Sequence, residues 1–209
     1  MINTETGPQA QDVSTPRRFC LLLPGLGYGP DRSLLYFAGK LAASHGFTVR
    51  SVAYHDLPTG AKKDPLALAQ ALSMVVEQTE EAVRALCLKP DDRLVLAGKS
   101  VGTVGAMHSL AHTFPEALVI LMTPLPQTFS DDRVPKRGAE GRGIVFHGLK
   151  DPWYPDSRDL QHACQALSLP LHVYEGANHS LETGDVLRDV GCLRDVMEKI
   201  DSLMISCFS

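Results

Sequence analysis

The chain has 209 residues, enough for one domain, and a domain of this size buries roughly 70% of the surface that its unfolded chain exposes. Its composition, 44% hydrophobic and 21% charged, is that of an ordinary globular protein. A formal net charge of −4 offers no basic field to attract polyphosphate backbones, so we expect no nucleic-acid partner. No apolar run approaches the ~18 residues of a membrane span, so we expect no membrane association.

We expect a cytoplasmic protein with reduced thiols, because its cysteines are odd in number and not closely paired. They are Cys20, Cys87, Cys164, Cys192 and Cys207. Residues 1–17 are polar, contain Pro8 and Pro16 and lack the apolar stretch of a secretory signal. We therefore predict a flexible N-terminal tail over 1–17 and a single domain over 18–209.

Short apolar runs alternate with helical patterns along the rest of the chain. The runs are typical of buried parallel strands, and they lie at Phe19–Leu23, Phe47–Tyr54, Leu94–Ala97, Ala117–Met122, Gly143–His147 and Leu171–Tyr174. Such alternation predicts an α/β protein, a three-layer α/β/α sandwich around a mostly parallel six-stranded sheet. Ligands of doubly wound sheets bind beyond the carboxyl ends of the strands.

Two of the helical patterns are well marked. Asp64-Pro65 predicts a helix cap and a first-turn proline, followed by an apolar stripe of Leu68, Leu72, Val75, Thr79, Ala82 and Leu86. A second stripe predicts a C-terminal helix packed on the sheet, through Val186, Val190, Leu193, Met197, Ile200 and Met204. The proline- and glycine-rich segment Thr123–Arg142 predicts a long surface loop and not a helical lid.

The stretch Gly98-Lys99-Ser100-Val101-Gly102 fits two kinds of chemistry. A phosphate-binding P-loop needs a glycine five positions before Gly98, but Arg93 stands there, and a strand runs directly into the turn. The pattern Gly-x-Ser-x-Gly between a strand and a helix instead favours a sharp turn that presents Ser100 as a nucleophile at a helix N-terminus.

A nucleophilic serine needs a base, and the base needs an orienting carboxylate. Asp151 follows the strand that ends at His147, and His179 follows the strand that ends at Tyr174. Ser100, Asp151 and His179 thus come in the order serine, acid, histidine, each just beyond a strand.

With this ordered trio and the glycine-rich stretch Leu22–Gly29 at the end of the first strand, the chain resembles the α/β-hydrolase superfamily from Phe19 to the C-terminal helix. The resemblance implies a fold lacking that family's first two strands and its helical cap. It also implies an oxyanion hole formed by the backbone N–H groups of Leu26 and Val101, although the flanking glycines leave a shift by one residue open. Pro24 stands where many relatives carry histidine.

These features predict a serine hydrolase of the carboxylesterase or thioesterase type that requires no cofactor and no metal. We expect an open, shallow pocket for a small acyl substrate that contacts Gly25 and Gly27. Trp153 either lines this pocket or packs behind the acid loop. The alternative is a non-catalytic binding or scaffold protein with the same fold. The oligomeric state is not indicated.

Several other residues have competing interpretations. Asp131 and Asp132 rival Asp151 as the acid. His108 and His112 are spaced to share a metal, but Ser109 replaces the glutamate of a zinc protease. Lys99 indicates either an acidic or phosphorylated substrate or simply a tolerated neighbour of the serine. His147 and His172 lie in predicted strands and favour structural roles.

Overall fold

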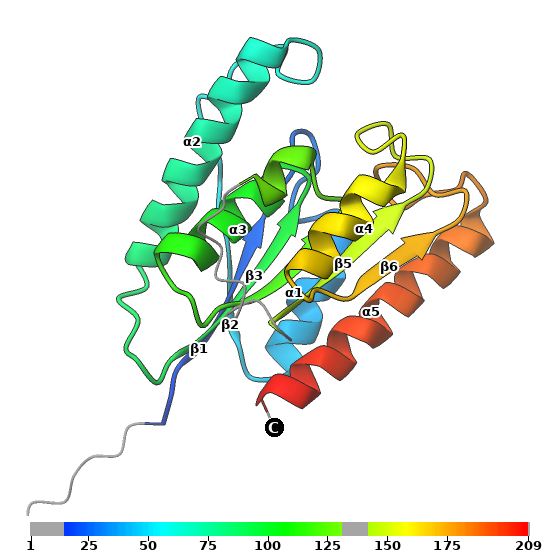
Figure 1. The fold of residues 1–209 in the computed structure, drawn as a ribbon. Coiled ribbons are helices and arrows are strands. Elements are labelled where there is room, and N and C mark those ends of the chain that lie inside the picture. Colours follow the sequence, from blue (N-terminus) through cyan, green and yellow to red (C-terminus); the bar gives the residue numbers. More distant parts are fainter. Residues whose placement is uncertain (1–14, 131–141, 209) are drawn as a thin grey trace, which may run out of the picture.

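A computed structural model describes residues 15–130 and 142–208 of the chain (Figure 1). Six strands form one sheet in which every pair of neighbouring strands is parallel. They are β1 (Arg18–Leu23), β2 (Thr48–Ser51), β3 (Arg93–Lys99), β4 (Leu118–Met122), β5 (Gly143–Gly148) and β6 (Leu171–Tyr174). The predicted α/β class and parallel sheet are confirmed.

The strand order is β2-β1-β3-β4-β5-β6. The chain first moves from β1 outward to β2, then returns to the other side of β1 and proceeds through β3 to β6. The direction therefore reverses between β1 and β3, whose last paired residues are Leu23 and Gly98. In open parallel sheets, such a reversal separates the loops at the carboxyl ends of the two strands and leaves room for a ligand.

The helices form a layer on each face of the sheet (Figure 1). α1 (Ser33–Ser44) and α5 (Val186–Phe208) pack on one face, in a core with Cys20, Leu22 and Ile120. α3 (Val101–His112) and α4 (Ser157–Ala166) pack on the other, with Leu21 and Leu23 among the buried strand residues. Alternate residues of β1 thus enter opposite cores, as the two-residue period of a strand requires.

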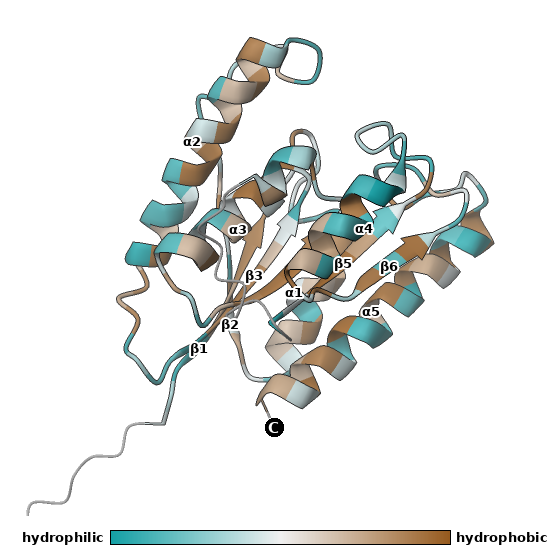
Figure 2. Cartoon of the chain, viewed as in Figure 1, coloured by the Kyte–Doolittle hydropathy of each residue, from teal (hydrophilic) through white to brown (hydrophobic). Residues whose placement is uncertain are grey.

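α2 (Pro65–Arg84) packs mainly against α3 and lies at the outside of its layer (Figure 1). Its start follows the predicted signal, because the Asp64 side chain accepts a hydrogen bond from the N–H of Leu66 and Pro65 occupies the first turn. Leu68, Leu72 and Val75 of the predicted stripe are buried. Figure 2 shows the apolar residues of the helices turned toward the sheet and polar residues on their outer sides.

The two edge strands are shorter or more exposed than expected. The predicted buried strand Phe47–Tyr54 is reduced to β2, in which three of four residues are exposed and one is partly buried. In β6, Tyr174 alone is buried. Each of these strands has one neighbour in the sheet, so its outer edge and part of its faces meet solvent, whereas β4 is buried throughout.

The predicted stripe on α5 is only partly correct. Ile200 and Met204 are buried, whereas Val186 is 75% exposed and Val190 is 59% exposed. A helix of 23 residues is about 34 Å long, but the six residues of β5 span about 20 Å. The first turns of α5 therefore extend beyond the surface on which its later turns pack.

The first residues of the predicted surface loop Thr123–Arg142 are buried. Thr123 and Leu125 are fully buried, and the N–H of Thr123 donates to the carbonyl of Phe146. The short 3₁₀ helix η1 (Pro126–Phe129) follows. The loop starts in the core because β4 delivers the apolar Leu125 against α3, and residues 131–141 lie outside the described part of the chain.

Most of the predicted tail, residues 1–14, also lies outside the described residues. Arg17, the last residue of that prediction, donates hydrogen bonds to the carboxylate of Asp92 from its backbone N–H at 2.9 Å and its Nε at 3.0 Å.

Among the described residues, no helix has both the length and the hydropathy that crossing a membrane requires.

Candidate active site

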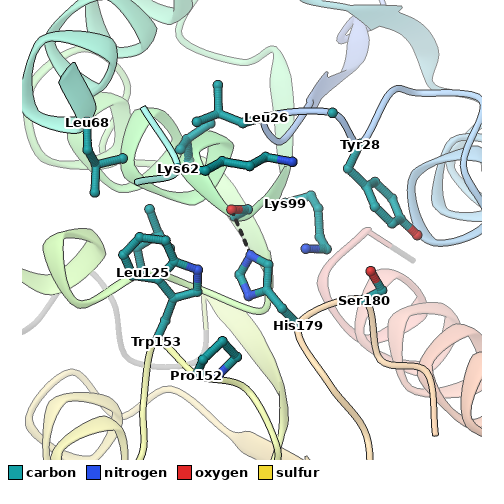
Figure 3. Close-up of a pocket in the computed structure, with 13 residues that line it drawn as sticks. Leu26, Tyr28, Lys62, Leu68, Lys99, Leu125, Pro152, Trp153, His179 and Ser180 are labelled. Atoms are coloured by element: carbon teal, nitrogen blue, oxygen red, sulfur yellow. Dashed lines mark hydrogen bonds between the residues drawn. The ribbon is translucent and has the colours of Figure 1, made fainter. Parts of the chain in front are cut away.

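Ser100 lies in a strained turn between β3 and α3. Its φ of 55° and ψ of −119° are rare for a residue with a side chain. The turn is held from both sides, because the N–H of Ser100 donates to the carbonyl of Met122 at 3.1 Å and its carbonyl accepts from the N–H of Thr103 at 2.9 Å. Ser100 lines the cavity at the carboxyl edge of the sheet, where His179 reaches its hydroxyl (dashed line in Figure 3).

Glycine is needed at Gly102, the second residue of α3, for this geometry to form. A Cβ atom on Gly102 would lie within clash distance of the carbonyl oxygen of Leu23, at the end of β1. The helix therefore starts in direct contact with the backbone of the neighbouring strand. This close approach is what the second glycine of the Gly-x-Ser-x-Gly pattern provides.

The structure brings the three side chains of the predicted trio together. His179 Nε2 lies 2.9 Å from Ser100 Oγ, and His179 Nδ1 lies 2.7 Å from Asp151 Oδ2. The other carboxylate oxygen of Asp151 accepts the N–H of Trp153 at 3.0 Å. An ionised carboxylate can only accept, so Nδ1 carries the proton and Nε2 is left to accept from the serine hydroxyl.

The three groups differ in exposure. The Asp151 carboxylate is fully buried, whereas the side chain of His179 is 26% exposed. Burial keeps water from competing for the carboxylate, so its bond to the imidazole is strengthened by the low local dielectric. The imidazole edge that faces Ser100 remains open to the cavity (Figure 3).

Gly148, at the end of β5, lets the histidine loop close onto the sheet. A Cβ atom there would lie 2.5 Å from the carbonyl oxygen of Asn178. The N–H of Lys150 donates to the carbonyl of Ala177 at 2.8 Å, which ties the acid loop to the histidine loop. On the far side of His179, Asn178 Oδ1 accepts the N–H of Ser180 at 2.7 Å. The loop that carries the imidazole is therefore held by one bond between backbone groups and one from a backbone N–H to a side chain.

The loop after β1 lies directly beside the serine. Gly25 and Tyr28 exchange two backbone hydrogen bonds of 3.1 Å, and Gly27 between them has a φ of 73°, so the loop is a tight turn with Leu26 at its tip. No residue in the described part of the chain accepts a hydrogen bond from the N–H of Leu26 or of Val101. Two uncommitted backbone donors thus flank Ser100, and both residues line the same cavity.

The cavity in front of Ser100 has a volume of about 510 Å³, within the range of small-molecule sites. One wall is apolar and contains Leu68, Leu125 and Trp153 (Figure 3). Of the residues predicted to contact substrate, Gly27 and Trp153 line the cavity, whereas Gly25 lies behind it, against the backbone of Lys99 and the Cβ of Ser100. Trp153 fits both of its interpretations, because it lines the cavity and also packs against two hydrophobic clusters of the core.

The opposite wall carries positive charge. Lys99 is 1% exposed, and its Nζ lies 4.9 Å from the centroid of the Tyr28 ring. Burial lowers the pKa of Lys99 to about 7, with the charge of Lys62 acting in the same direction and those of Asp151 and Glu182 opposing it. The sequence singled out Lys99 but not Lys62, because Lys62 lies in a loop with no motif around it.

A second histidine lies behind the acid. His147 is fully buried, and its Nδ1 is 3.8 Å from Asp151 Oδ2. Neither ring nitrogen has a hydrogen-bond partner in the part of the chain that the structure describes. Burial lowers the pKa of His147, so the ring is neutral at pH 7 and packs edge-on against Tyr154.

The rival residues are placed differently. Asp131 and Asp132 lie outside the described residues. His108 and His112 lie on one face of α3 with tilted rings whose centroids are 4.3 Å apart, and His108 Nε2 lies 3.0 Å from Glu80 Oε1. Within residues 15–130 and 142–208, no three histidine, cysteine or carboxylate side chains gather in a way that could hold a metal ion.

No protein-family model matches the chain, and no curated protein sequence matches it. Solved structures with the same fold do exist. A proposed hydrolase of the alpha/beta superfamily from Xanthomonas campestris pv. campestris is 22% identical with a TM-score of 0.63, and the match covers 89% of this chain and 99% of that one.

Two further solved structures agree with this likeness. A serine hydrolase without a lid from Xanthomonas campestris is 20% identical with a TM-score of 0.61, over 95% of this chain and 85% of its own. Est1E from Butyrivibrio proteoclasticus is 11% identical with a TM-score of 0.65, over 92% and 88% of the two chains. The chain therefore has the α/β-hydrolase fold.

Proposed function

We propose that this protein is a serine hydrolase that cleaves esters or related acyl bonds through an acyl-enzyme on Ser100. The observation that carries the proposal is the continuous hydrogen-bonded chain from Asp151 through His179 to Ser100, with distances of 2.7 and 2.9 Å. Hydrolases with the same fold, one of them a serine hydrolase without a lid, support it.

In the first step, His179 Nε2 takes the proton of the Ser100 hydroxyl as Oγ bonds to the carbonyl carbon of the substrate. The carbonyl π electrons move to its oxygen, which becomes negatively charged. The N–H groups of Leu26 and Val101 are available to bind this oxyanion, and one such donor is typically worth about 3–4 kcal/mol. The helix N-terminus at Val101 adds favourable potential for the same charge.

The tetrahedral intermediate then collapses, and the leaving group departs with the proton held by His179. Water attacks the acyl-enzyme in the second half of the reaction. His179 removes a proton from this water and returns it to Ser100 as the acid product leaves. Throughout, the buried Asp151 holds the imidazole tautomer and stabilises its positive charge.

The cavity supports the carboxylesterase or thioesterase type of activity on small acyl substrates. Its volume of about 510 Å³ suits an acyl group and a leaving group of modest size. The apolar wall of Leu68, Leu125 and Trp153 is suited to the hydrocarbon part of such a substrate.

Turnover of a panel of short-chain 4-nitrophenyl esters, thioesters and amides tests the proposal. We expect hydrolysis by the wild-type protein and at least about a thousandfold loss of kcat in Ser100→Ala and in His179→Ala, with both variants folded. A wild-type protein that folds but hydrolyses no member of the panel would instead favour a binding or scaffold role for this fold.

A further inference from the structure

Lys99 is the last residue of β3 and precedes the candidate nucleophile, yet it carries a buried charged group. Its side chain is almost completely removed from solvent. Within the described part of the chain, no ion pair joins its Nζ to a carboxylate, and the Nζ lies 4.9 Å from the centroid of the Tyr28 ring. A buried ammonium group without a paired anion is costly to a fold, so its retention in a substrate cavity needs an explanation.

Lys99 points into the cavity in front of Ser100 and not into the protein core. Figure 3 shows its Nζ between His179 and Tyr28, on the side of the cavity away from Leu125 and Trp153. The Tyr28 hydroxyl is occupied elsewhere, since it accepts the N–H of Leu34 at 3.2 Å. The Tyr28 hydroxyl therefore does not bind the Lys99 ammonium group, and only the face of the Tyr28 ring contacts it. The N–H groups of the ammonium remain available for a ligand.

Lys62 supplies a second positive charge on the same wall. Its Nζ lies over the turn beside the candidate oxyanion hole, 3.1 Å from where a Cβ atom of Gly27 would be. Figure 3 shows it reaching across the cavity toward the Tyr28 side, where Lys99 also ends. The two lysines come from loop and strand segments far apart in sequence, and the effect of Lys62 on the pKa of Lys99 indicates that their charges interact.

The cavity is thus divided, with a cationic wall facing an apolar wall and Ser100 between them. We propose that the substrate carries a carboxylate, which binds between Lys99 and Lys62 while its acyl carbon lies at Ser100. This rests on the proposed hydrolase activity for its chemistry, but the anion site itself requires only the two lysines. A bound carboxylate would pair the buried charge of Lys99 and form charge-assisted hydrogen bonds with it.

Two pairs of esters test the proposal and show which half of the substrate carries the charge. Mono(4-nitrophenyl) glutarate and its methyl ester differ by a carboxylate on the acyl group. The pair 4-acetoxybenzoate and methyl 4-acetoxybenzoate differ by a carboxylate on the leaving group. We expect kcat/KM of the wild-type protein to favour the charged member of at least one pair by about 10-fold or more at pH 6.5.

The variants Lys99→Met and Lys62→Met should each lose most of this preference. Methionine retains the length and volume of the lysine stem, so the cavity keeps its shape while the charge is removed. Lys63→Met is the matched control, because Lys63 is exposed next to Lys62 and does not line the cavity, and it should keep the wild-type ratio. An unchanged ratio in Lys99→Met would overturn the proposal.

A binding measurement separates this inference from the proposed activity. Glutarate is titrated into Ser100→Ala by calorimetry at pH 6.5, with and without the additional Lys99→Met substitution. Binding that disappears with Lys99→Met supports the anion site even if no ester is hydrolysed, in which case the hydrolase proposal alone fails. Hydrolysis of neutral and charged esters at equal rates, with no glutarate binding, overturns the anion site alone.

Discussion

His179 Nδ1 lies 2.7 Å from Asp151 Oδ2, while the second oxygen of the same carboxylate accepts the N–H of Trp153 at 3.0 Å. Asp151 is thus fixed by the loop that follows β5 and in turn fixes the imidazole that comes from the loop after β6. Two loops are joined at one buried carboxylate.

The variant Asp151→Asn should keep this geometry and lose the chemistry. Its amide oxygen can still accept the N–H of Trp153, but the amide NH₂ group would then face Nδ1 and favour the tautomer protonated on Nε2. In this tautomer, the imidazole cannot accept the serine proton. We expect kcat to fall by about 10³- to 10⁴-fold at pH 7.5, with a melting temperature within a few degrees of wild type. A loss of less than tenfold would show that Asp151 does not orient the imidazole.

Gly148→Ala should displace the histidine loop from the end of β5. The added methyl group would meet the carbonyl oxygens of Ala177 and Asn178, and backbone cannot move aside as a flexible side chain can. We expect at least about a tenfold loss of kcat/KM and a lower melting temperature. Gly191→Ala is the control, because a Cβ atom on this helical glycine meets nothing within 4 Å and should leave stability equal or higher by up to ~1 kcal/mol. Equal effects of the two substitutions would contradict this account.

Lys99→Met should stabilise the protein, and most strongly at pH 7 or below. The pKa of Lys99 is lowered to about 7 in the folded protein, mainly by burial, whereas in the unfolded chain it returns to near 10.5. Between these values the unfolded chain binds more protons, so the contribution of Lys99 to the free energy of unfolding rises with pH. The advantage of the variant should reach on the order of 4 kcal/mol near pH 7 and shrink by about 1 kcal/mol per pH unit toward pH 9.

Urea unfolding at pH 7, 8 and 9 measures this difference. Lys150→Met serves as the control, because Lys150 is exposed and its removal should change stability by less than about 0.5 kcal/mol. A Lys99→Met protein that is less stable than wild type throughout this range would mean that the buried lysine is paired in the folded protein.

His147→Phe should make the protein less sensitive to mild acid. Burial lowers the pKa of His147 in the folded protein below its ordinary value of 6.5. As the pH falls below 6.5, the unfolded chain takes up a proton that the folded protein does not, so this histidine lowers stability there. Phenylalanine should remove that loss while keeping the edge-on contact with Tyr154. Thermal unfolding between pH 7 and 5 checks this, and a variant that loses as much stability in acid as wild type would contradict it.

Much of this arrangement could be predicted from the sequence because the important signals are local. The strand before Ser100 and the glycine at 102 define the turn from neighbouring residues alone, and the parallel sheet places Asp151 and His179 at the same edge. The prediction for the edge strands was wrong in extent or burial. The exposure of a strand depends on its position in the sheet, and the residues of Phe47–Tyr54 alone do not reveal that position. The exposure of Val186 and Val190 depends similarly on where the sheet ends under α5.

The cavity walls could not be predicted because they are assembled from distant segments. Leu68 belongs to the regular stripe of α2, and Leu125 lies in a segment that the proline and glycine content indicated as surface. Lys62 has no neighbouring motif, so its place beside the turn at Gly27 emerges only when α2 packs on α3. Residues of this kind can be assigned to the cavity only once the helices and strands that carry them are packed together.

The most direct test of the central claim is the reaction of the folded protein with a fluorophosphonate, followed by mass spectrometry of its peptides. One phosphonyl group per chain should be found on Ser100, absent in Ser100→Ala and formed much more slowly in His179→Ala, while Ser202→Ala at an exposed site reacts as wild type does. A folded protein that remains unmodified, or one modified at another serine, would contradict the account.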